Sequence, residues 1–200
     1  NKDIFAIRGE LGFFFNDNFD AQIAFDSVSD DSKPRGAQML AVNPYAPGLL
    51  VSPKTQPLSS RYDVRSGMPD VNSTDLQGWS LTLNYKASDD WTFKYILADR
   101  ESDTDTYIDF DTLPEQITDV KAFYNDEQLS QELQANFDNG GKSRGVMGLY
   151  WFDGNAGGLV QNVFLKGVIP NFPGLFGDTR GSVDTTSFAA YIDWTYDLSQ

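Results

Sequence analysis

The sequence contains no cysteine and no histidine among its 200 residues. The absence of cysteine excludes disulfide bonds and thiolate metal sites, and the absence of histidine removes the commonest general base and metal ligand. Serine–histidine and cysteine–histidine catalysis are therefore impossible in this chain. No apolar run approaches the roughly 20 residues of a membrane-spanning helix. We predict that the chain is not an enzyme and holds no metal and no cofactor.

Basic residues are also scarce. The chain has 15 Lys and Arg against 29 Asp and Glu, a formal net charge of −14 at pH 7. Proteins that bind nucleic acid need a basic surface, so we expect no nucleic-acid partner. Aromatic residues are plentiful at 14%, which suits β-strands better than helices.

Seven segments alternate between apolar and polar residues with the period of two that marks a strand with one apolar face. They lie near residues 3–15, 19–27, 76–86, 91–100, 128–137, 143–152 and 186–197. The sixth segment is apolar on both faces, so the pattern does not orient it. The sequence therefore predicts an all-β chain of about seven strands.

Short and long connections alternate along the chain. The short ones, at 16–18, 87–90 and 138–141, are rich in residues that form tight turns. The long ones lie roughly at 28–74, 101–126 and 153–184. Short periplasmic turns and long extracellular loops are typical of antiparallel transmembrane β-barrels, whose strands need about 9–11 residues to cross a bilayer.

Aromatic residues on the apolar faces gather near the short turns and the chain end. An aromatic girdle at one membrane interface has this pattern. A soluble β-sandwich, with the same aromatics in a core between two sheets, is the alternative. The residues concerned are Phe13, Phe15, Phe19, Tyr85, Trp91, Phe137, Trp194 and Tyr196.

Much of the chain resembles the barrel domain of TonB-dependent outer-membrane receptors, most clearly over residues 75–153. The resemblance is carried by GWSLTLNY at 78–85, SDDWT at 88–92, YIDFD at 107–111, DEQLSQELQ at 126–134 and GVMGLYWFD at 145–153. The run at 128–133 is very like a Q-x-S-Q-E-L motif of the family, and KPRGA at 33–37 is also similar to it.

This resemblance implies a barrel of about 22 strands around a plug domain, in the bacterial outer membrane. It implies TonB-dependent active import of a ferric siderophore or another scarce, bulky nutrient. The partners implied are the TonB complex, the nutrient ligand, outer-membrane lipid and lipopolysaccharide. The sequence departs from the family pattern because it has neither a plug nor an energy-coupling box. We therefore expect residues 1–200 to be part of a single barrel domain in a longer chain. A passive porin-type channel is the alternative function in a membrane, and a soluble binding module is the alternative outside one.

Two sets of residues are candidates for binding. The first is the polar face of the strands, expected to face the barrel lumen and the plug domain: Arg8, Glu10, Asp20, Gln22, Lys94, Arg100, Glu132 and Gln134. The second is aromatic and lies in the expected extracellular loops, where it would contact ligand or pack the loops against one another: Tyr107, Phe110 and Tyr124.

Residues 101–127 are also acidic, with carboxylates at Asp103, Asp105, Asp109, Asp111, Glu115, Asp119 and Asp126. Spaced carboxylates suit calcium. The spacing lacks the glycine and the terminal glutamate of a calcium-loop motif. We therefore interpret the segment as a solvated extracellular loop, or one that divalent ions bridge to lipopolysaccharide.

Overall fold

The computed structural model describes residues 2–41 and 56–198. In this part of the chain seven antiparallel strands form one sheet, and their order in the sheet is their order in the sequence. The strands are β1 (Ile4–Asn16), β2 (Phe19–Asp30), β3 (Asn72–Lys86), β4 (Trp91–Asp109), β5 (Gln116–Asp138), β6 (Ser143–Lys166) and β7 (Leu175–Tyr196). The described residues contain no helix long and apolar enough to cross a bilayer.

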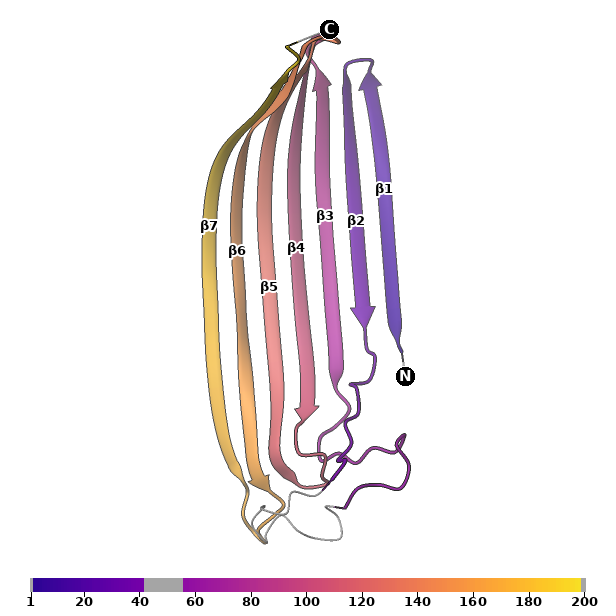
Figure 1. Cartoon of the computed structure of the whole chain (residues 1–200), viewed down its shortest axis with the longest axis vertical. Helices are drawn as coiled ribbons and strands as arrows, with labels where there is room; N and C mark the ends of the chain where they lie inside the picture. The colour runs from indigo at the N-terminus through magenta and orange to yellow at the C-terminus, as the bar shows by residue number, and fades with distance from the viewer. Residues whose placement is uncertain (1, 42–55, 199–200) are drawn as a thin grey trace.

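The strands lie side by side in a single curved layer (Figure 1). The three short turns, at 17–18, 87–90 and 139–142, lie at one end of the sheet together with the end of β7. The connections after β2, β4 and β6 lie at the other end. We call these the short-turn end and the far end.

The strand register places the apolar faces of the strands on one side of the sheet. Leu81 of β3, for example, pairs with Ile23 of β2 and Leu97 of β4. Residues paired directly in antiparallel strands point to the same face, so these side chains share one surface. Register also orients the sixth strand: its Leu149 pairs with Leu133, on the apolar face.

Almost nothing covers the apolar face. The buried hydrophobic residues of the described chain are only Ala21, Met68, Leu113, Ala122 and Val163. The exposed residues of the apolar face include Phe5, Ile7, Leu11, Phe13, Ile23, Phe25, Trp79, Tyr85, Phe93, Leu133, Leu149, Phe188, Ile192, Trp194 and Tyr196. The described strands form one sheet, so the second sheet that a β-sandwich requires is not among them.

The strands extend further toward the far end than the sequence predicted. Strand β4 continues to Asp109 and β5 begins at Gln116, so most of the predicted loop at 101–126 is strand. Most of the predicted loop at 153–184 likewise belongs to β6 and β7. These segments mix apolar and polar residues on both faces and therefore lack the regular apolar alternation by which the other strand segments were recognised. Of the three predicted long loops, only the connection at 31–71 is long, and its residues 42–55 lie outside the described part.

Candidate functional site: the polar face of the sheet

The register places all eight predicted polar-face residues on one face of the sheet. Asp20, Lys94 and Gln134 belong to a single row, because Asn84 pairs with both Asp20 and Lys94, and Lys94 pairs with Gln134. The other five lie on the neighbouring rows: Arg8, Glu10, Gln22, Arg100 and Glu132. That this face meets a plug domain stays a prediction.

Several of these side chains hydrogen-bond to neighbouring strands. Gln22 donates from Nε2 to Glu10 Oε1, and Asn84 donates from Nδ2 to Asp20 Oδ2 at 2.8 Å. Lys94 differs, because it makes no hydrogen bond or ion pair with any residue in the described ranges. Its ammonium group is thus the one predicted polar-face cation left available to an anionic partner.

Gly78 allows an ion pair to form across an intervening strand. It lies between Asp26 and Arg100 in the register. A Cβ at Gly78 would come within 2.9 Å of Arg100 Cγ. The arginine side chain therefore lies over Gly78, and its Nη2 reaches Asp26 Oδ1 at 3.0 Å. The ion pair ties β4 to β2 across β3.

Gly148 of β6 has the same role on the same face, nearer to β7. A Cβ on this glycine would collide with the ring of Tyr191 from β7. The ring therefore lies over β6, and the Tyr191 hydroxyl donates to Glu132 Oε1 of β5 at 2.6 Å. Glu132 Oε1 also accepts from Gln134 Nε2 at 3.0 Å. The missing side chain again lets a long side chain reach the strand beyond its neighbour.

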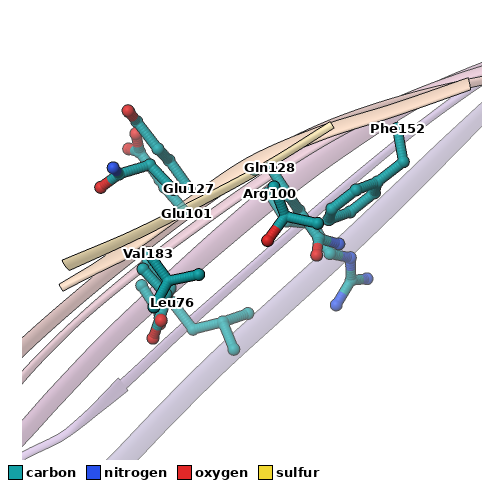
Figure 2. A pocket seen from close by; sticks show the side chains of 13 residues that line it. Leu76, Arg100, Glu101, Glu127, Gln128, Phe152 and Val183 are labelled. Atoms are coloured by element: carbon teal, nitrogen blue, oxygen red, sulfur yellow. The ribbon is translucent and has the colours of Figure 1, made fainter. Parts of the chain in front are cut away.

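A recess of about 280 Å³ lies on the polar face, toward the far end. Figure 2 shows Leu76, Arg100 and Phe152 on one side of the sheet and Glu101 and Glu127 on the other. The recess thus offers both apolar surface and one guanidinium group. Its remaining polar-face lining is Ser102, Asp126, Gln128, Gly154, Ala156, Val183 and Thr185.

Of the predicted polar-face residues, only Arg100 lines this recess. Sequence reasoning missed Leu76 and Phe152, which contribute much of its apolar wall. Phe152 belongs to the segment whose orientation the pattern did not resolve. Alternation along this segment could have placed Phe152. Leu149 and Trp151 occupy the apolar face, so Phe152 lies on the polar face.

The three predicted ligand-contacting aromatics do not form one site. Tyr107 lies in β4 and Tyr124 in β5, so the prediction that both lie in loops was wrong. They also point to opposite faces, because Thr104, three residues before Tyr107, is the register partner of Tyr124. Phe110 follows the end of β4 and is exposed. The prediction failed because these strand ends have no apolar face to mark them.

Aromatic rings gather on the apolar face at the short-turn end, as predicted. The ring centroids of Phe137 and Trp91 are 4.9 Å apart, and those of Phe137 and Trp194 are 5.2 Å apart. Trp194 Nε1 donates to Ser143 Oγ at 2.9 Å. The apolar rings thus meet a polar group at the short-turn end of the strands, and buried or half-buried Trp N–H groups usually find such a partner.

The acidic residues at 101–127 separate into two kinds. Asp109, Asp111 and Asp119 have carboxylate oxygens within 4.8 Å of one another at the far end of β4 and β5. Asp103 and Asp105 are exposed on β4 and do not join this group.

No protein-family model matches the chain, and no curated protein is significantly similar to it.

Proposed function

We propose that this chain is part of the barrel wall of a TonB-dependent receptor in the bacterial outer membrane, which imports a ferric siderophore or another bulky nutrient. The observation that carries the proposal is the uncovered apolar face of a one-layer sheet. An exposed apolar face that extends over all seven strands is unusual for a monomer in water, because exposed apolar patches on soluble monomers rarely exceed a few hundred Å². Lipid on one side and a polar lumen on the other accommodate both faces.

The limits of the apolar band support a membrane crossed by tilted strands. On β1 the band reaches Phe5, whose row continues through Ser29, Asp75 and onward to Ser182 of β7. On β7 the band begins only at Phe188, after the outward-facing Asp184 and Thr186. The band thus moves toward the short-turn end from β1 to β7. A flat membrane cuts the rows obliquely in this way when barrel strands are tilted by about 35–45°.

The polar face supports the transport part of the proposal. In the proposed barrel this face lines the lumen, and Lys94 is available to a carboxylate of the plug domain. The recess combines an apolar wall with the guanidinium group of Arg100 and the carboxylate of Asp126, which suits an organic ligand with both apolar and polar groups. The motif resemblance at 78–153 is our reason for proposing a TonB-dependent receptor in preference to a porin. The two edges of the sheet, β1 and β7, are in this proposal paired with further strands.

The test is energised uptake by the full chain. We would express it in a Gram-negative strain that lacks its own siderophore receptors and offer a panel of siderophores loaded with radioactive iron. We expect uptake of at least one siderophore, and loss of that uptake when a protonophore or a TonB deletion removes the energy source. Uptake that persists without energy would establish the passive channel instead.

A pair of variants links uptake to the recess. Leu76→Trp fills the recess, and we expect it to abolish uptake. Leu81→Trp places the same ring on the apolar face of the same strand, where we expect uptake to continue. Equal uptake by both variants, at the level of the unchanged chain, would exclude the recess from the transport path.

A further inference from the structure

Three carboxylates converge at the tip of the β4–β5 hairpin. Asp109 is the last residue of β4, Asp111 lies in the connection, and Asp119 of β5 is the register partner of Asp109. One carboxylate oxygen from each of the three lies within 4.8 Å of the other two. None of the ion pairs in the described part of the chain includes any of the three. The cluster therefore brings three acidic side chains together at one point of the hairpin.

Asp119 is the most unusual member of the cluster. Its exposed fraction is 0%, and it is the only buried polar or charged side chain among the described residues. Neither of its carboxylate oxygens has a hydrogen-bond partner. The nearby N–H of Phe110 donates instead to the carbonyl oxygen of Thr118, at 3.3 Å. A buried carboxylate without a partner is costly, so such groups are normally paired or bind a metal.

The other two carboxylates are held in place by backbone N–H groups. Asp109 accepts from Gly67 and Thr112, at 2.9 and 2.5 Å. Asp111 accepts from the backbone N–H groups of Leu113, Ile117 and Thr118, at 2.7–2.8 Å. These bonds fix the carboxylates beside Asp119 and leave lone pairs for a further contact, because a carboxylate has about four acceptor sites.

Burial, and then the charges of Asp111 and Asp109, raise the pKa of Asp119 to about 7. Burial and the charge of Asp109 also raise the pKa of Asp111, although three backbone N–H groups oppose the rise. Both groups lie beyond the proposed membrane-spanning part of the strands. The three charges thus repel one another, and a bound cation would relieve that repulsion.

We propose that Asp109, Asp111 and Asp119 bind one calcium-like divalent cation, with Asp119 as the buried ligand. The donors are oxygens only, which favours a hard cation over zinc or copper. Calcium accepts six to eight oxygens in flexible geometry, whereas magnesium demands a near-ideal octahedron. Asp109 and Asp111 are only half-buried, so water has access to the remaining positions.

The site would fasten two outer segments together. Gly67, whose N–H donates to Asp109, belongs to the connection between β2 and β3. A Cβ on Gly67 would lie 3.0 Å from the carbonyl oxygens of Leu113 and Pro114, so the two segments are in close contact. Beside them Met68 and Leu113 form part of the small buried core. A cation that holds Asp109 therefore also holds this connection against the hairpin tip.

The experiment is a calcium titration by calorimetry of the full chain, stripped with EDTA, in the buffer or detergent in which it is monodisperse. We expect one calcium ion to bind and the melting temperature to rise by at least about 4 °C. Asp119→Asn should weaken binding at least 10-fold. The matched control, Asp105→Asn, removes the same charge from an exposed site on β4 and should change affinity less than 2-fold.

Failure of the unchanged chain to bind calcium, or equal affinity of Asp119→Asn, would overturn the proposal. If Asp119→Asn does not fold, Asp111→Asn replaces it with the same expectation. The melting shift of the unchanged chain needs no variant, and its absence at saturating calcium would also overturn the proposal. Because the readout is ion binding, it is independent of whether the chain imports a nutrient.

Discussion

A charged substitution on the exposed apolar face should change the stability of the chain by an amount that depends on whether lipid or water surrounds the sheet. Ile192 lies in the middle of the apolar band of β7, between Phe188 and Tyr196, and its side chain is 68% exposed. We would replace it with arginine. Because the protein covers so little of Ile192, the stability change reports mainly on what surrounds the sheet.

The magnitude follows from the depth of the residue in the proposed membrane. An arginine that faces lipid at the bilayer midplane of a barrel costs about 2–4 kcal/mol, and one near the interface costs about 0–1 kcal/mol. Ile192→Arg should therefore lower the free energy of unfolding by about 3 kcal/mol, and Tyr196→Arg by about 1 kcal/mol or less. In water, the same exposed substitution would stay within about 0.5 kcal/mol of no change.

The assay is equilibrium unfolding of the full chain in lipid vesicles with guanidinium, followed by tryptophan fluorescence. Ala189→Arg is the matched control, because Ala189 is exposed on the polar face of the same strand. We expect it to change stability by less than about 1 kcal/mol. If Ile192→Arg and Ala189→Arg were equally stable, the apolar face would not contact lipid and the membrane proposal would be refuted.

Three further substitutions test individual contacts. Trp194→Ala removes two ring contacts, including that with Phe137, and should lower stability by about 1–3 kcal/mol in the same assay. Tyr191→Phe removes the hydrogen bond to Glu132 and should cost about 0.5–1.5 kcal/mol. If the bond is the cause, Tyr191→Phe should have no such effect in a Glu132→Ala background, where the acceptor is absent. Gly140→Ala should cost about 1 kcal/mol from the positive φ of 65° alone, since a Cβ there meets nothing within 4 Å; no loss on denaturation would contradict this reasoning.

The alternation of apolar and polar residues predicted the strands wherever a strand has one apolar and one polar face. On β4, Trp91, Phe93, Tyr95 and Leu97 face one way and Lys94 the other, and the register confirms this arrangement. The polar-face residues were found for the same reason. Alternation did not predict which polar groups pair, because those pairs depend on register. The ion pair of Arg100 with Asp26, for example, needs a glycine at the matching position of the strand between them.

The candidate cation site was hidden from the sequence for a different reason. The acidic segment was interpreted as one long loop, in which no carboxylate has a fixed neighbour. Only the pairing of Asp109 with Asp119 across the hairpin brings three carboxylates together. A signal was nevertheless available: Thr104, Thr106 and Ile108 alternate with other residues up to the end of β4. β-Branched residues at every second position favour a strand even when neither face is apolar.

The apolar alternation and the strand therefore end at different residues, and the two limits have different causes. On β4 the apolar face stops at Leu97, and the backbone pairing continues to Asp109. In the proposed barrel the first limit is set by the membrane and the second by how far the hairpin projects from it. Beyond the membrane the hairpin has no lipid against it, although β3 pairs with β4 as far as Thr106 and β6 pairs with β5 as far as Gln116. A cation at the tip, joining Asp109 to Asp119 and holding the connection at Gly67, would add a further link where the pairing of β4 with β3 ends.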